Sequence, residues 1–138
     1  PRLFLAYEEN PSDSGKIHSD VRFRFNQGDA EVVAAMKTFA RIAEEARAAL
    51  LRRDEAQLAT LMNANFDLRR RIFGDKVLGP KNLEMIAIAR SLGFPGKFSG
   101  SGGAIIGCFA TDADRQRLEE AYTRRGYQFL EIRPQGKK

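Results

Sequence analysis

A short segment rich in glycine and serine lies between two apolar stretches of the sequence. Glycine allows positive φ angles and lets a ligand come close to the main chain. Successive N–H groups in such a turn form a concave anion site, to which serine hydroxyls add donors. We therefore predict that this segment binds phosphate, although many glycine-rich hairpin turns bind nothing. The residues that would do so are Lys97, Ser99, Gly100, Ser101, Gly102 and Gly103.

The glycine segment differs from two widespread phosphate-binding loops. A Walker-type loop needs Gly-Lys-Ser or Gly-Lys-Thr after its first glycine, and no such triplet follows here. The dinucleotide-binding fingerprint needs a helix after its glycines, whereas the apolar run 104–110 has the pattern of a strand. The segment is therefore expected to be the turn of a β-hairpin.

Three successive arginines, Arg69 to Arg71, lie in a stretch with helical periodicity. Asn65, Arg69 and Ile72 share one helix face, because they are three or four residues apart. Polar residues at the edge of an apolar stripe often line a cleft, so we predict that Asn65 and Arg69 bind a substrate. Adjacent arginines also form ordinary solvated surface, and the sequence does not show which of Arg69, Arg70 and Arg71 faces the cleft.

The polar segment 10–19 has more hydrogen-bonding groups than a simple connection needs. Functional groups concentrate on loops that a rigid scaffold holds in place. The alternative is that Ser12 and Asp13 only build turns, and His18 has no triad partners that would make it a catalyst. No catalytic residue stands out elsewhere. The candidate substrate-binding residues of this segment are Ser12, Asp13, Ser14, Lys16 and His18.

The composition is that of a single globular domain covering residues 1–138, with a formal net charge of +5. Most Arg and Lys residues alternate with Asp and Glu, which favours solvated helix faces over a nucleic-acid surface. No segment has the length and apolarity of a membrane span, so we expect no membrane partner. The lone Cys108 fits a reducing cytoplasm, and the single histidine argues against a zinc site.

Hydrophobic periodicity predicts the order of the elements that must position these residues. The first predicted elements are a strand over 3–7 and a strand or loop arm over 16–25. Three helices follow, which begin after Asp29, after Asp54 and at Pro80. The chain then forms a hairpin of 94–99 with 104–110, a helix from Asp112 and a strand over 127–132. This order indicates an α+β fold. It is the ferredoxin-like split βαβ arrangement, with a mostly antiparallel four-stranded sheet and extra helices in the first crossover.

The predicted helix after Asp29 has an apolar residue at nearly every helical turn. Its expected buried stripe consists of Val32, Met36, Phe39, Ala43, Ala46 and Leu50. The stripe expected in the helix after Asp54 consists of Leu58, Leu61, Met62, Phe66, Leu68 and Ile72. Both stripes predict helices that pack on a core.

The segment 96–104 resembles the third conserved motif of the GHMP kinases, which include galactokinase, homoserine kinase, mevalonate kinase and phosphomevalonate kinase. Nearly the whole chain resembles the C-terminal domain of these enzymes. Residues 10–19, 62–71 and 97–103 are most similar to the glucuronokinase-like branch of sugar kinases. The chain departs from the family at Ala104, where a fourth glycine is usual, and it lacks the family loop Pro-x-x-x-Gly-Leu-Gly-Ser-Ser-Ala.

This resemblance implies part of an ATP- and Mg²⁺-dependent kinase that transfers the γ-phosphate to a sugar hydroxyl, with a glucuronate-like sugar acid as one candidate substrate. The N-terminal ATP-binding domain, which would supply the catalytic residues, is absent from this chain. The isolated chain is therefore expected to be inactive. Its expected partners are the sugar, the N-terminal half of the enzyme and, through the exposed domain interface, further copies of itself.

Two alternatives remain open at the level of sequence. The same fold could be a non-catalytic regulatory module that binds a small anionic ligand at the glycine segment. A sheet face could also bind RNA, which requires exposed aromatic side chains on the strands. Phe98 and Phe109 lie near the hairpin, but their apolar surroundings favour the core.

Overall fold

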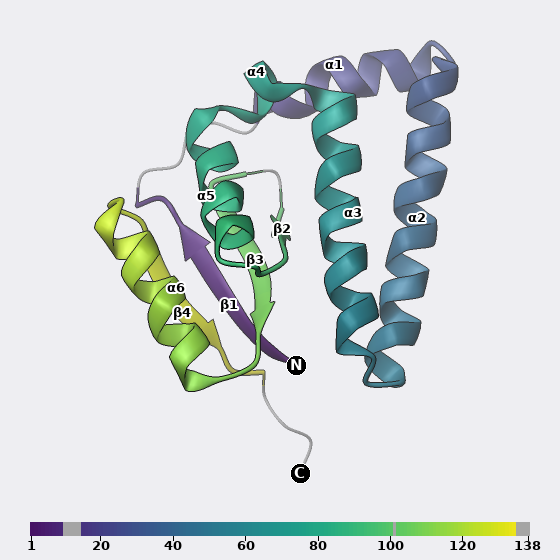
Figure 1. The fold of residues 1–138 in the computed structure, drawn as a ribbon. Coiled ribbons are helices and arrows are strands. Elements are labelled where there is room, and N and C mark those ends of the chain that lie inside the picture. The colour runs from purple at the N-terminus through teal and green to yellow at the C-terminus, as the bar shows by residue number, and fades with distance from the viewer. Residues whose placement is uncertain (10–14, 101, 135–138) are drawn as a thin grey trace.

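The computed structural model describes residues 1–9, 15–100 and 102–134, and for residues 15–19 it describes the backbone alone. The predicted site residues Ser12, Asp13, Ser14 and Ser101 lie outside these ranges. The elements are β1 (Arg2–Tyr7), α1 (Gly15–Asn26), α2 (Ala30–Leu51), α3 (Glu55–Phe73), α4 (Asp75–Leu78), α5 (Pro80–Ser91), β2 (Gly96–Phe98), β3 (Ala104–Phe109), α6 (Asp112–Arg124) and β4 (Gln128–Ile132) (Figure 1). None of the described helices is long and apolar enough to cross a membrane.

The strands form one sheet in the order β2-β3-β1-β4, and all of its pairings are antiparallel. The central strand β1 lies between β3 and β4, so that Leu3 pairs with Cys108 on one side and Ile132 on the other. This confirms the predicted α+β, ferredoxin-like architecture, with the extra helices between β1 and β2. The glycine segment connects β2 to β3 as the predicted hairpin.

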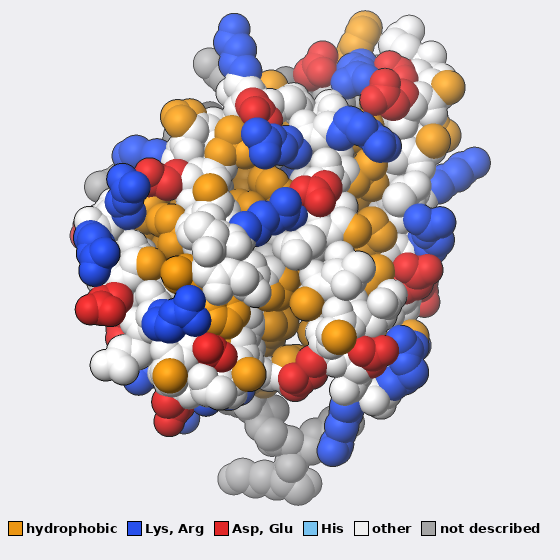
Figure 2. Space-filling view, in the orientation of Figure 1, with side chains coloured by type: hydrophobic (Ala, Val, Ile, Leu, Met, Phe, Trp, Pro, Cys, Tyr) orange, Lys and Arg blue, Asp and Glu red, His pale blue; other side chains and the backbone are white. Residues whose placement is uncertain are grey.

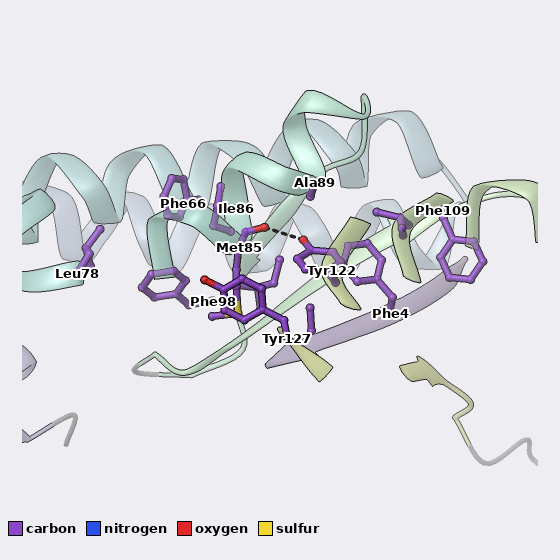
Figure 3. Close-up of a cluster of buried hydrophobic side chains, with 13 residues drawn as sticks. Phe4, Phe66, Leu78, Met85, Ile86, Ala89, Phe98, Phe109, Tyr122 and Tyr127 are labelled. Carbon is purple, nitrogen blue, oxygen red and sulfur yellow. Dashed lines mark hydrogen bonds between the residues drawn. The ribbon is translucent and has the colours of Figure 1, made fainter. Parts of the chain in front are cut away.

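The main core lies between the sheet and the helices α5 and α6. Phe4 and Ala6 of β1 point into it, and the Tyr122 hydroxyl donates a hydrogen bond to the carbonyl of Met85 at 2.6 Å (Figure 3). Both phenylalanines considered for RNA binding are buried, because Phe98 is 0% and Phe109 6% exposed. They are therefore not available to stack on bases.

Helices α2 and α3 form a long antiparallel pair beside the sheet, and α1 lies across one end of that pair (Figure 1). The stripe predicted for α3 is buried as expected. The stripe predicted for α2 is partly wrong, because Ala43 and Leu50 are exposed. The buried residues include Ala35, Ile42 and Ala49, which are seven residues apart. This spacing is typical of a helix that follows a neighbouring helix along its whole length.

The segment 16–25 is helix α1 and not the predicted strand or loop arm. Val21, Phe23 and Phe25 alternate with polar residues, which suggested a strand with one buried face. In the structure Val21 is buried, whereas Phe23 is 62% exposed. Val21 and Phe25 instead share a helix face, because they are four residues apart.

Asp29 begins α2 as the predicted N-cap, and its carboxylate accepts hydrogen bonds from Glu31 N at 3.0 Å and Val32 N at 3.3 Å. The Arg24 guanidinium, which also donates to this carboxylate at 3.1 Å, is the main reason why the pKa of Asp29 lies below its ordinary value. A carboxylate whose pKa is lowered by folding stabilises the folded state above its ordinary pKa. This contribution is lost as the pH falls through the lowered value.

We therefore expect Asp29→Asn to make the acid destabilisation of the chain less steep, since asparagine keeps the cap but has no charge for Arg24. Urea unfolding midpoints between about pH 2 and pH 7 would measure the effect. The exposed Glu44→Gln on the same helix is the control. Identical pH profiles for Asp29→Asn and the wild type would contradict the expectation.

Candidate functional site

A cavity of about 480 Å³ opens between α1, α2, α3 and β2. On the face shown in Figure 2, hydrophobic side chains gather in recesses between Lys and Arg side chains. The cavity is lined by Val21, Arg22, Phe25, Met36, Phe39, Asn65, Arg69, Phe73 and Lys97. It therefore brings together three of the predicted site residues from two separate segments, namely Asn65 and Arg69 of α3 and Lys97 of β2.

Arg69 is held between two aromatic rings. Its guanidinium carbon lies 5.4 Å from the ring centre of Phe73 and 5.2 Å from that of Phe98, within the range of cation–π attraction. Burial lowers the pKa of Arg69. Among the described residues, its buried Nε has no hydrogen-bond partner, and neither has the buried Oδ1 of Asn65 one helical turn earlier. A polar group buried in this way costs free energy unless a ligand or water satisfies it.

Lys97 is the second partly buried cation of the cavity. Its Nζ donates a hydrogen bond to the carbonyl of Phe98 at 2.6 Å. The pKa of Lys97 is lowered, first by burial and second by the positive charge of Arg69. The two cations therefore repel each other across the cavity. In the part of the chain that the structure describes, none of the side chains lining this cavity is acidic.

The structure distinguishes the three neighbouring arginines. Arg70 forms two hydrogen bonds to the carboxylate of Asp75, at 2.6 and 2.8 Å, on the exposed surface. Arg71 is exposed. Arg69 is the one that lines the cavity, together with Asn65 on the same helix face. Helical spacing predicted that Asn65 and Arg69 share a helix face. It did not show which of the three arginines faces the cavity, nor which other elements would complete the site.

The glycine hairpin is held by hydrogen bonds at both of its ends. At one end, the Ser99 N–H and hydroxyl both donate to the carbonyl of Ala104, at 3.2 and 3.4 Å. At the other end, Gly103 N–H donates to Asn82 Oδ1 at 2.8 Å, and Glu8 N–H donates to the Gly103 carbonyl at 2.9 Å. The N–H groups of Ser99 and Gly103 thus have partners inside the protein. That the segment binds phosphate stays a prediction.

Asn82 is a buried residue of this region that the sequence did not indicate. It lies in the first turn of α5, and its Nδ2 donates to the carbonyl of Leu78 at 2.7 Å. Its carboxamide thus connects the α4–α5 turn to Gly103. A polar residue near the start of a helix usually faces solvent, so no pattern in the sequence predicts this contact.

The remaining predicted residues are only partly described. Lys16 and His18 belong to α1, and their side chains lie outside the described part of the structure, as do Ser12, Asp13, Ser14 and Ser101 entirely. Gly100 and Gly102 belong to the hairpin turn, where Gly102 has a φ of 144°. Over the described ranges, no group of three or more His, Cys, Asp or Glu residues is arranged to hold a metal ion.

Comparisons with known proteins give a consistent relationship. The chain is 49% identical over 129 residues to glucuronokinase 1 of Arabidopsis thaliana, a match that covers 92% of this chain and 35% of that protein. Probable glucuronokinase 2 of the same plant gives the same identity and coverage. The chain thus spans about a third of the length of these curated relatives.

Solved structures share the fold. The L. major mevalonate kinase in complex with R-mevalonate superposes with a TM-score of 0.78 at 24% identity, over 97% of this chain and 43% of that one. The Lin0012 protein from Listeria innocua gives a TM-score of 0.77 at 21% identity, over 96% of this chain and 40% of that one.

The family model described as GHMP kinases C terminal matches residues 46–128, which include α3, both strands of the glycine hairpin and α6. This match covers more than half of the chain and confirms the resemblance inferred from the motifs. The chain belongs to the GHMP kinase family and corresponds to the C-terminal domain of its members.

Proposed function

We propose that the protein containing this chain is an ATP-dependent kinase that phosphorylates a hydroxyl of a sugar acid. The relatives named glucuronokinase support the activity, since they match 92% of the chain. The observation that carries the proposal is that one strand joins both candidate sites. Lys97 of β2 lines the cationic cavity, and the same strand leads directly into the hairpin at Ser99.

In the proposed reaction, the sugar hydroxyl oxygen forms a bond to the γ-phosphorus of ATP. The bond from that phosphorus to the bridging oxygen breaks, ADP leaves, and the hydroxyl proton passes to a base. Phosphoryl transfer depends mainly on positioning and on neutralising charge. This chain would hold the sugar in the cavity and place the hairpin turn near the transferred phosphate. The base and the ATP-binding loop would come from the N-terminal part of the enzyme, and Mg²⁺ would arrive with ATP.

The proposal predicts that the full-length protein releases ADP in the presence of glucuronate and Mg²⁺, and that this chain alone does not. A coupled ADP-release assay would test glucuronate, galacturonate, glucose, galactose and mevalonate. If the full-length protein turns over ATP with none of them, the kinase proposal is overturned and the regulatory alternative is favoured.

A substitution in the hairpin turn tests the role of this chain in the same assay. A Cβ added at Gly100 meets nothing within 4 Å, so Gly100→Val should fold normally while its branched side chain keeps a phosphate away from the main chain. We expect a loss of kcat/KM for ATP of about tenfold or more, equivalent to about 1.4 kcal/mol. Unchanged kinetics would remove the hairpin turn from the proposed mechanism.

A further inference from the structure

We propose that Arg69 and Lys97 form a carboxylate subsite through which the enzyme selects sugar acids over the corresponding neutral sugars. This proposal rests on the kinase function proposed above and names the chemical group that its cavity recognises. Asn65 completes the subsite by accepting a hydrogen bond from a neighbouring hydroxyl of the same sugar.

The charges of the cavity support an anionic ligand. Elsewhere in the chain, partly buried arginines lie beside carboxylates: Arg2 contacts Glu131 at 3.2 Å, and Arg24 contacts Asp29 at 3.1 Å. Arg69 and Lys97 differ, because the described lining of their cavity holds no acidic side chain. Two desolvated cations without a counter-charge are unfavourable. A bound carboxylate would supply that charge.

The hydrogen-bonding groups support a sugar acid over a simple anion. Stacking against Phe73 and Phe98 restricts the guanidinium of Arg69, and its unpartnered Nε is one arm of the fork that binds a carboxylate through two parallel hydrogen bonds. The unpartnered Oδ1 of Asn65 can only accept a hydrogen bond. Acetate has no hydroxyl group and cannot satisfy both atoms. A molecule with a carboxylate beside hydroxyl groups can.

The size and walls of the cavity fit a monosaccharide. Its volume of about 480 Å³ lies in the range of small-molecule sites and exceeds that of one sugar ring. Phe25, Met36 and Phe39 supply apolar walls from α1 and α2, against which the C–H face of a pyranose would pack. The two partly buried cations lie on the α3 and β2 side, whereas Arg22 of α1 is exposed. The carboxylate end of the sugar would therefore point toward the sheet.

The test is the Arg69→Gln variant of the full-length enzyme, assayed with glucuronate and with glucose, which differ only at C6. We expect kcat/KM for glucuronate to fall about 100-fold, mainly through KM, because a charged hydrogen-bonded pair is replaced by a neutral contact. Activity with glucose should fall much less, so that the ratio of kcat/KM for glucuronate to that for glucose drops. Arg71→Gln is the matched control, since Arg71 is an exposed neighbour on the same helix.

The outcomes separate this proposal from the kinase function. A wild-type enzyme that phosphorylates no sugar acid overturns the kinase proposal itself. A wild type active on glucuronate, with Arg69→Gln affecting both sugars equally or neither, overturns the subsite and leaves the kinase intact. If Arg69→Gln does not fold, as judged by its thermal unfolding, Lys97→Met is tested for the same selective loss. Isothermal titration with glucuronate and glucose gives the corresponding change in affinity.

Discussion

Replacing Gly107 by alanine should lower the free energy of unfolding by about 3 kcal/mol or more. Gly107 lies in β3, where it pairs with Phe4 of β1 on one side and Gly96 of β2 on the other. A Cβ at Gly107 would collide with the ring of Phe4 and with the carbonyl oxygen of Pro95. Phe4 is fully buried and Pro95 contributes backbone, so neither can move without disrupting the sheet. A loss of this size is a large fraction of the stability of an ordinary domain.

Urea unfolding of the chain, followed by circular dichroism, would measure the effect of Gly107→Ala. Gly100→Ala is the control, because the added Cβ has open space around it. That variant should lie within about 0.5 kcal/mol of the wild type. If Gly107→Ala is equally harmless, β3 is free to shift away from Phe4 and the described packing of the sheet is incorrect.

Replacing Asn82 by alanine should lower the free energy of unfolding by about 2–4 kcal/mol, because two buried backbone groups lose their partner. These are Gly103 N–H and the carbonyl of Leu78, which contact Asn82 at 2.8 and 2.7 Å. The change also frees one end of the glycine hairpin. We therefore expect faster amide hydrogen exchange at Gly103 and, in the full-length enzyme, a lower kcat.

The control for Asn82 is Asn63→Ala, on α3. Asn63 Oδ1 also accepts a hydrogen bond from a backbone N–H, that of Gly96, but the distance is 3.3 Å and the side chain is only half-buried. Its replacement should cost less than that of Asn82 and should leave exchange at Gly103 unchanged. Equal costs for the two variants, with no change at Gly103, would show that Asn82 does not hold the hairpin.

The strands and most helices could be predicted from the sequence because they depend on the preferences and spacing of residues that are close in the chain. Asp29, Asp54 and Pro80 have strong preferences for helix starts, and all three are found there. Helix α1 was missed because its apolar residues also fit a period of two. Which period applies depends on the part of the protein that the segment faces. Val21 and Phe25 face the cavity that residues of α2 and α3 also line.

The candidate site could be predicted only in separate parts. Helical spacing identified Asn65 and Arg69, and the glycine motif identified Lys97, but nothing in the sequence indicates that they share one cavity. That arrangement arises because α3 packs against the short edge strand β2, with Phe66 of α3 against Phe98 of β2 at 5.6 Å between ring centres. The contact joins segments distant in the chain, so local patterns do not contain it.

The position of β1 in the sheet has a consequence for the order in which a ribosome makes the protein. Leu3 needs Cys108 and Ile132 as its partners, so the central strand leaves the ribosome long before either neighbour exists. The pair α2–α3 has contacts close in sequence and can fold meanwhile. Until β3 and β4 are translated, β1 has unsatisfied edges on both sides. A pause in translation before β3 would therefore prolong the period in which β1 can pair with other nascent chains.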